Sequence, residues 1–284
     1  MAAKAKVLER GRDCPLSLSY YTVPNLTPPE VVNVAAESGC QHVGLRLLGG
    51  QPGDNEMPLL IDANLRRLTR LLMVDTGITA LDANTARIVP ETDIQAFLPF
   101  LDVAAELGAR HVLTTADDPE GGRLVDNLIA LGDAATERAL TIDLEFVPWL
   151  SICNVLNAAD LIRRCEHPAI GIAVDALHFS RSGSEVGDLR DLPSSWFRYV
   201  QVCDAPYLLS PPGRDELIHE AIKERLLPGE GIIDLVGLLR ALPPSLPLAI
   251  EIPQASLAAT MGDLERVTRA VKATRALLNE IGVT

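Results

Sequence analysis

The chain has 284 residues, of which 48% are hydrophobic, and its formal net charge is −13 at pH 7. This length and apolar content suit one large core, so we expect a single domain. Nucleic acid and anionic membranes need clustered Lys and Arg, which the acidic balance opposes. Because no apolar run approaches the roughly 20 residues of a membrane-spanning helix and the N-terminus lacks a signal-peptide core, we expect a cytoplasmic protein without membrane partners.

Short β-branched segments alternate along the chain with longer segments of helical period, which is typical of parallel strands joined by crossover helices. Eight such strands close a barrel. The sequence therefore predicts an α/β fold, a single-domain (β/α)8 TIM barrel over residues 15–284, with residues 1–14 as a flexible N-terminal extension. The predicted strands are 16–20, 42–47, 79–82, 111–115, 141–146, 171–175, 199–203 and 248–252.

Helix boundaries are marked by capping residues. Thr27, two prolines and Glu30 form a start signal, in which a hydroxyl cap precedes prolines that the first turn tolerates. Gly39, Gly77 and Gly108 each follow a helical stretch and precede a predicted strand, as expected for left-handed cap residues.

The segment 204–231 interrupts the strand–helix alternation. It contains four prolines and many charged residues around one short helical stretch. Loops of this length in a compact domain are usually functional or disordered, so we interpret the segment as a functional loop over the barrel mouth. The turn of sequence LPGEG at 227–231 feeds the next helix, and its glycines would allow backbone to approach a ligand.

The residues that close strands five to eight form the main candidate site. These positions carry Glu145, Asp175, Gln201 and Glu251, and in a parallel barrel they meet at the active-site face. Three converging carboxylates would repel one another unless a cation lay between them. We therefore predict a divalent metal site, in which oxygen ligands favour Mn²⁺ or Mg²⁺ and leave Co²⁺ or Zn²⁺ as alternatives. Taken singly, each residue would more often be a helix cap or a salt-bridge partner.

Further polar residues follow strands that end at the same face. His178 follows Asp175 by three residues and would orient a ligand, meet the substrate or play a structural part. Substrate-binding candidates are Arg46, Arg181, Arg214, Arg225 and Glu220. The arginines would hold a carboxylate or phosphate through paired N–H donors, and surface ion pairs are the alternative for each.

Several common signatures are absent from the sequence. There is no phosphate-binding G-x-x-x-x-G-K-[ST], no G-x-G-x-x-G after a first strand and no G-x-S-x-G elbow. The sequence therefore lacks the usual motifs of nucleotide-dependent transfer, nicotinamide redox chemistry and serine hydrolysis.

The motifs together resemble the sugar phosphate isomerase/epimerase family, the xylose isomerase-like barrel. The resemblance covers nearly the whole chain and is carried by LSLS at 16–19, VGLRL at 43–47, LGAR at 107–110, LEF at 144–146, DALH at 175–178, QVCDA at 201–205, LPGEG at 227–231 and EIP at 251–253. Its most specific part is the polar set on strands five to eight.

The resemblance implies a metal bound by Glu, Asp, His and Glu, where Gln201 of this chain stands in place of the usual histidine. An amide oxygen can coordinate a hard cation, and some dehydratases similar to dehydroshikimate dehydratase carry glutamine there. Family chemistry implies an enediolate stabilised by the metal, with Glu145 and Glu251 as acid and base. In a dehydratase, His178 would be the acid that expels hydroxide. The resemblance also implies that the protein forms a homo-oligomer, as relatives often do.

The first functional hypothesis is a metal-dependent isomerase or epimerase of a carbohydrate-like small molecule: a sugar, sugar phosphate or polyol ketone. The second is a lyase that dehydrates a cyclic polyhydroxy ketone or acid, similar to dehydroshikimate or inosose dehydratase, and Gln201 is its main support. A non-catalytic ligand-binding or accessory subunit is a third. Zinc-dependent endonuclease activity is disfavoured by only five histidines and the charge of −13.

Overall fold

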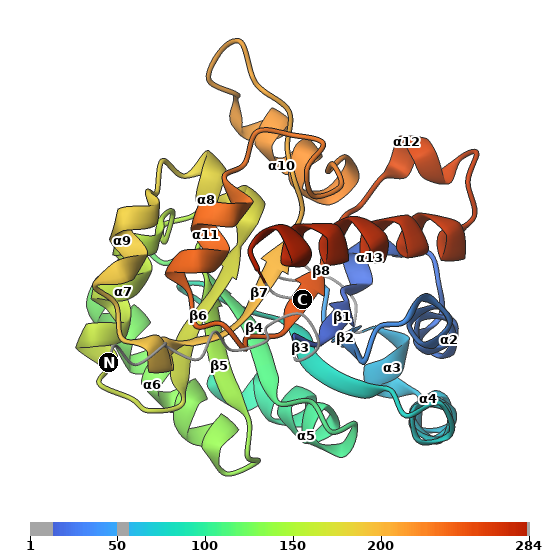
Figure 1. Cartoon of the computed structure of the whole chain (residues 1–284). Helices are drawn as coiled ribbons and strands as arrows, with labels where there is room; N and C mark the ends of the chain where they lie inside the picture. The colour runs from blue at the N-terminus through green and yellow to red at the C-terminus, as the bar shows by residue number, and fades with distance from the viewer. Residues whose placement is uncertain (1–13, 50–56, 283–284) are drawn as a thin grey trace, which may run out of the picture.

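The computed structural model describes residues 14–49 and 57–282. Its eight parallel strands hydrogen-bond in chain order and close into a barrel, which confirms the predicted TIM barrel (Figure 1). The predicted N-terminal extension, residues 1–14, lies outside the described residues except for Cys14. The strands are β1 Leu16–Leu18, β2 His42–Arg46, β3 Thr79–Ile88, β4 His111–Ala116, β5 Thr141–Glu145, β6 Ile170–Asp175, β7 Phe197–Val202 and β8 Leu248–Ile250.

Strand β3 differs most from its prediction, because it continues six residues beyond Asp82. It pairs with β2 as far as Asn84, which lies opposite Arg46, and with β4 from Asp82 to Ile88, where Arg87 lies opposite Thr115. Asn84 and the alanines beside it have weak strand propensity, but pairing with two neighbours overrides local preference. The extension carries two residues of this strand, Thr85 and Arg87, to the barrel mouth.

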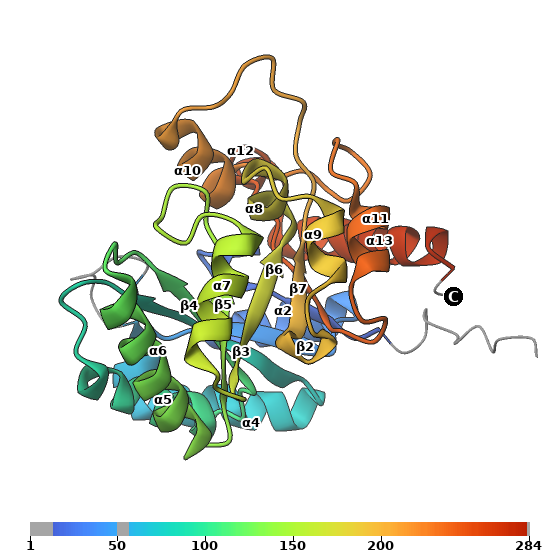
Figure 2. The same ribbon diagram turned by 90° about the vertical axis from the view of Figure 1, so that its left-hand side faces the viewer.

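Helices surround the barrel (Figures 1 and 2). Helix α13 packs against α2 and so closes the outer layer. The α-helices are α2 Pro28–Ser38, α3 Pro58–Ile61, α4 Ala63–Thr76, α5 Leu98–Glu106, α6 Gly121–Thr136, α7 Val155–Cys165, α8 Ala176–Arg181, α9 Val186–Arg190, α10 Arg214–Lys223, α11 Leu235–Ala241, α12 Ala255–Ala258 and α13 Asp263–Glu280. Short 3-10 helices are η1 Tyr20–Thr22, η2 Ile94–Phe97 and η3 Ser194–Trp196.

The predicted helix boundaries are present, although the Thr27 hydroxyl donates to the Glu30 carboxylate instead of capping a backbone N–H. The Glu30 carboxylate accepts a hydrogen bond of 2.8 Å from the Thr27 backbone N–H at the start of α2. Gly39, Gly77 and Gly108 have φ values of 87°, 74° and 76°, so all three adopt the left-handed conformation that glycine tolerates best. These caps set where each helix stops and the next strand begins.

The apolar core has two parts. The larger one lies mainly between the strands and the helices, whereas a small cluster includes Leu81, Leu113, Ala173, Tyr199 and Ala249. Apolar burial of this kind contributes roughly 25 cal/mol per Å² and fixes the strands on which the polar residues stand. Among the described residues, no helix combines the length and apolarity needed to cross a bilayer.

The long connection after β7 contains α10, which packs near α8 (Figure 1). Its start and end are joined by an antiparallel bridge between Asp204 and Leu226. The Asp204 carboxylate also accepts hydrogen bonds from the backbone N–H groups of Gly229 and Gly231, at 3.0 and 2.9 Å. A Cβ on Gly231 would lie 2.2 Å from the Ala205 carbonyl oxygen. The glycines of this turn therefore approach the protein's own carboxylate and backbone.

Candidate active site

The four predicted metal ligands converge at the barrel mouth. Glu145 and Asp175 are the last residues of β5 and β6, Gln201 is the next-to-last residue of β7, and Glu251 directly follows β8. Asp175 lies opposite Gln201 in the strand register, and all four side chains are buried. Consecutive parallel strands thus bring together residues up to 106 positions apart in the chain.

Glu251 and Gln201 are joined by direct hydrogen bonds. The Gln201 amide Nε2 donates to Glu251 Oε2 at 3.0 Å, and Ser19 Oγ donates to Glu251 Oε1 at 2.7 Å. These contacts orient the amide so that Gln201 Oε1 is buried with no hydrogen-bond partner among the described residues. A buried acceptor without a partner costs about 1–3 kcal/mol, so Gln201 Oε1 is an acceptor that a ligand would satisfy.

The Asp175 carboxylate accepts hydrogen bonds from the first turn of a helix and from a buried arginine. Its Oδ1 accepts from the His178 backbone N–H at 2.9 Å, which caps α8. Its Oδ2 accepts from Arg225 Nη1 at 2.6 Å, and the same Nη1 lies 3.4 Å from Glu251 Oε2. The side chain of Arg225 is only 3% exposed. The guanidinium therefore neutralises two of the predicted ligands from inside the protein.

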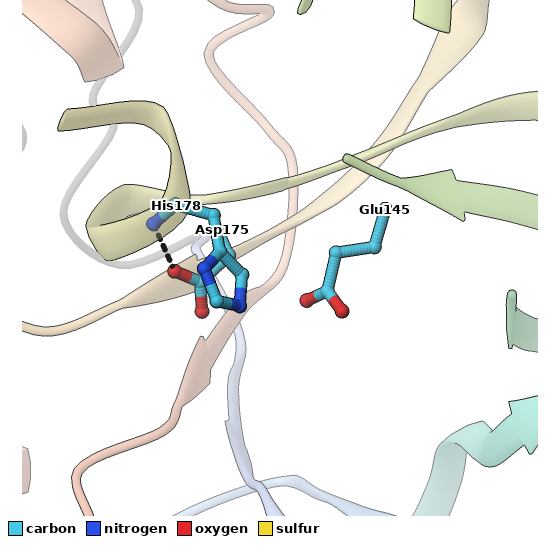
Figure 3. Close-up of side chains that lie close together, drawn as sticks. All are labelled: Glu145, Asp175 and His178. Carbon is cyan, nitrogen blue, oxygen red and sulfur yellow. Dashed lines mark hydrogen bonds between the residues drawn. The ribbon is translucent and has the colours of Figure 1, made fainter. Parts of the chain in front are cut away.

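His178 stands beside Asp175 at the start of α8 (Figure 3). Potential ligand atoms of Glu145, Asp175 and His178 all lie within 4.8 Å of one another. The imidazole packs edge-on against Trp149, with ring centroids 5.2 Å apart, and its Nδ1 is buried without a hydrogen-bond partner in the described chain. His178 thus faces the site that its neighbours form.

Burial shifts the pKa values of this set in different directions. Burial and the nearby Asp175 and Glu251 raise the pKa of Glu145 well above its usual value, and burial raises that of Glu251 to about 7. Burial also raises the pKa of Asp175, but Arg225 and His178 outweigh it and bring the value to about 2. Burial lowers the pKa of His178 to about 4. At neutral pH the imidazole is therefore neutral and Asp175 is ionised.

The donor set fits a divalent cation. It offers carboxylate oxygens from three strands, the unpartnered Oε1 of Gln201 and a neutral imidazole. Among the described residues, none donates a hydrogen bond to Glu145, so its carboxylate is also open to a ligand. Oxygen-rich sets of this kind suit hard cations, and an added imidazole also suits zinc.

A cavity of about 340 Å³ is lined by Glu145, His178 and Glu251 of this set, whereas Asp175 and Gln201 lie outside its lining. Its wall includes Arg46, which stacks on Tyr20 and Tyr21 with its guanidinium carbon 5.3 and 4.8 Å from the ring centroids. Residues of the wall that sequence reasoning missed are Thr85, Arg87, Thr115 and Trp149. An alternating pattern from Thr79 to Ile88 was the signal for Thr85 and Arg87, but the polar residues concealed it.

Two predicted substrate-binding residues contact each other. Arg181 donates to both carboxylate oxygens of Glu220, at 2.8 and 2.6 Å, and also to the Pro206 carbonyl oxygen at 2.9 Å. Neither side chain lines the cavity, whereas Arg225 does. Arg214 is exposed at the first turn of α10. The structure thus brings Arg46 and Arg225 to the cavity and leaves Arg181, Glu220 and Arg214 outside it.

Comparison with known proteins gives relatives of two kinds. The chain is 31% identical over 144 residues to a 3-dehydroshikimate dehydratase of Pseudomonas putida, a match that covers 49% of this chain and 22% of that protein. The matched region is therefore about a fifth of that relative's length.

Solved structures share the fold at lower identity. A fusion of a xylose isomerase-like TIM barrel with 4-hydroxyphenylpyruvate dioxygenase superposes with a TM-score of 0.80 at 22% identity, over 95% of this chain and 43% of that one. The IOLI protein, solved with a bound zinc atom, has a TM-score of 0.79 at 19% identity, over 94% and 99% of the two chains. The family model described as xylose isomerase-like TIM barrel matches residues 32–277, and the chain belongs to that family.

Proposed function

We propose that this protein is a divalent-metal-dependent lyase that removes water from a cyclic polyhydroxy keto acid of the 3-dehydroshikimate type. The observation that carries the proposal is the set of Glu145, Asp175, Gln201 and Glu251 at the mouth, with Gln201 Oε1 buried and unpartnered. The similarity to the Pseudomonas putida dehydratase supports this reaction over others of the family.

The four mouth residues would hold the cation, and His178 is near enough to join or adjust the set. When bound, such a cation supplies Lewis-acid polarisation of a carbonyl oxygen. The oxygen ligands favour Mn²⁺ or Mg²⁺, and a zinc-containing structural neighbour keeps Zn²⁺ among the candidates.

His178 would move the proton, since its imidazole lies beside Glu145 and Asp175 and lines the cavity. Its pKa of about 4 keeps the imidazole neutral at pH 7, so it can accept a proton from the carbon beside the substrate carbonyl. The imidazolium formed would then donate that proton to the departing hydroxyl group. One residue would thus act as base and then as acid, while Trp149 holds its ring in place.

Arginines in the cavity wall would bind the acid group of the substrate. Arg46 and Arg87 line the cavity, as does Arg225, whose charge is already compensated by Asp175 and Glu251. Guanidinium groups bind carboxylates through paired N–H donors, so the wall favours an anionic ring over a neutral sugar. The small cavity volume, about 340 Å³, suits a single ring.

An isomerase or epimerase is the second candidate. It is favoured by Glu145 and Glu251, which both reach the cavity and both have raised pKa values. Two buried carboxyl groups with raised pKa values are suited to exchange protons with opposite faces of a carbon.

A substrate comparison tests the proposal. The protein, stripped of metal and reloaded with Mn²⁺, Mg²⁺, Co²⁺ or Zn²⁺, is assayed with 3-dehydroshikimate for water loss and with a panel of keto-sugars for epimerisation. We expect metal-dependent water loss that falls at least about 10³-fold in Glu145→Gln, a variant of nearly the same shape. Epimerised sugar without water loss would instead establish the second candidate.

A further inference from the structure

Arg225 is an internal cation placed on the predicted metal ligands. Its Nη1 lies 2.6 Å from Asp175 Oδ2 and 3.4 Å from Glu251 Oε2. The other contacts of the side chain come from the protein backbone and a thiol, because Nε donates to the Ala221 carbonyl oxygen at 2.8 Å and Nη1 lies 3.6 Å from Cys203 Sγ. The buried guanidinium therefore obtains its charge compensation from the residues that would also hold a metal.

A divalent cation bound to these oxygens would be a second positive charge in the same space. Both oxygens of Asp175 already accept hydrogen bonds, Oδ1 from His178 and Oδ2 from Arg225. Two cations that share one buried carboxylate repel each other strongly, since little water screens them. Either the guanidinium shifts when metal binds or metal binding is weakened.

The guanidinium has room to shift, and the shift would reach α10. Arg225 lines the 340 Å³ cavity, as do Ile218, Ala221 and Ile222 of α10. Arg225 lies two residues beyond the end of α10, and its Nε is hydrogen-bonded to that helix. At the same helix, the Arg181–Glu220 pair attaches α10 to α8 and contacts none of the mouth carboxylates.

We propose that Arg225 competes with the divalent cation for Asp175 and Glu251, so that metal binding moves the guanidinium off Asp175 and loosens the C-terminal end of α10. This inference rests on the proposed metal site. It makes Arg225 a positioning residue that sets metal affinity and couples it to the helix that covers the cavity.

Equilibrium binding of Mn²⁺ to the metal-free full chain tests the competition. We expect Arg225→Gln to bind Mn²⁺ about tenfold more tightly than the wild type, because a neutral amide removes the competing charge. Arg225→Lys keeps the charge and should stay within about threefold of the wild type. Arg181→Gln is the matched control, since it removes the other arginine that attaches α10 and should leave the Mn²⁺ dissociation constant unchanged.

Weaker Mn²⁺ binding by Arg225→Gln than by the wild type would overturn the proposal. If Arg225 only orients Asp175 for the metal, Arg225→Gln should weaken Mn²⁺ binding by about 10- to 100-fold. Absence of Mn²⁺ binding to the wild type and to Arg225→Gln alike would refute the metal site, and with it the proposed function. Binding to the wild type that does not tighten in Arg225→Gln would refute the competition alone.

Hydrogen exchange of the wild type gives a second test, which does not depend on whether any variant folds. Saturating Mn²⁺ should make backbone amides in residues 217–226 exchange several-fold faster, while the α13 amides stay unchanged. Unchanged exchange in 217–226 at saturating Mn²⁺ would show that the metal leaves Arg225 in place, which contradicts the proposal.

Discussion

The barrel holds two buried polar clusters that are built from similar residues and satisfied in different ways. The mouth cluster consists of Glu145, Asp175, Gln201, Glu251 and Arg225. The lower cluster lies nearer the strand starts and consists of Asp82, Asn84, His111, Thr141, Asp143 and Tyr199.

The carboxylates of the lower cluster are contacted mainly by hydroxyl, amide and imidazole groups. Asp82 Oδ2 accepts from Tyr199 Oη at 3.2 Å and from Asn84 Nδ2 at 3.1 Å. Asp143 Oδ2 accepts from Thr141 Oγ1 at 2.7 Å and lies 3.1 Å from His111 Nδ1. These contacts come from the strands themselves, so the cluster serves the packing of the barrel.

The mouth cluster differs because a buried arginine is hydrogen-bonded directly to one of its carboxylates. Arg225 compensates Asp175, whereas Gln201 Oε1 is left without a partner among the described residues. An internal structural cluster gains stability by filling every acceptor, and a binding site must leave some acceptors for its ligand. Asp143 Oδ1 of the lower cluster is also buried without a hydrogen-bond partner among the described residues, so an open acceptor alone does not separate the two clusters. The cavity separates them, because Glu145, Glu251 and Arg225 line it and no residue of the lower cluster does.

The largest expected effect comes from Asp175→Asn in the mouth cluster. The substitution removes the negative partner of a buried guanidinium, which should lower the free energy of unfolding by about 3–5 kcal/mol. It should also abolish measurable Mn²⁺ binding, because a charged ligand is lost. Urea unfolding and equilibrium Mn²⁺ binding would measure the two effects.

The double variant Asp175→Asn/Arg225→Gln is the control for the predicted loss in the free energy of unfolding. It removes both charges of the pair and should recover most of the lost free energy of unfolding, while Mn²⁺ binding stays abolished. A double variant no more stable than the single one would show that the unpaired guanidinium is not the cause.

The strand-end residues could be predicted from the sequence because strand alternation and the one-sided mouth of a barrel are local regularities. Glu145, Asp175 and Gln201 each fall at or next to a strand end that the pattern located within a residue or two. The extension of β3 was missed because its pairing depends on β2 and β4, which are distant in the chain. Arg87 was missed with it.

Pairing between charged side chains was beyond local reasoning. The sequence made Arg181 and Glu220 separate candidates, but they are 39 positions apart and bind each other across α8 and α10. Arg225 was predicted to meet the substrate, and the structure also places it on Asp175. The tertiary fold decides which carboxylate an arginine pairs with, because the sequence of a polar loop does not show which of its charged residues will be neighbours in space.

An intermediate effect is expected for Asp82→Asn in the lower cluster. Here the substitution removes a negative charge that destabilises the folded protein, whereas in Asp175→Asn it removes a charge that stabilises it. Burial raises the pKa of Asp82 from 3.8 to about 6. Because the folded value is the higher one, the stability from the protonated carboxyl is complete below pH 3.8 and is lost as the pH rises to 6. The wild type should therefore lose about 3 kcal/mol relative to Asp82→Asn across that interval.

Urea unfolding of both proteins at several pH values between 3.5 and 7.5 would measure this difference. Asp126→Asn, on an exposed position of α6, is the matched control and should change the free energy of unfolding by less than about 0.5 kcal/mol throughout. A wild-type curve parallel to that of Asp82→Asn would mean that Asp82 does not titrate between pH 3.8 and 6.

The smallest effect is expected for Tyr199→Phe, which removes one neutral donor from Asp82 and keeps the ring that packs near His111. The loss should be about 1 kcal/mol at pH 4, where Asp82 is protonated, and about 2 kcal/mol at pH 7.5, since hydrogen bonds to a charged acceptor are stronger. Urea unfolding at the two pH values would measure both. The Mn²⁺ dissociation constant should stay within twofold of the wild type, because neither Asp82 nor Tyr199 lines the cavity. A larger change in Mn²⁺ affinity would show that the two clusters are coupled through the barrel interior, and the division between structural and functional polar groups would then have to be redrawn around Tyr199.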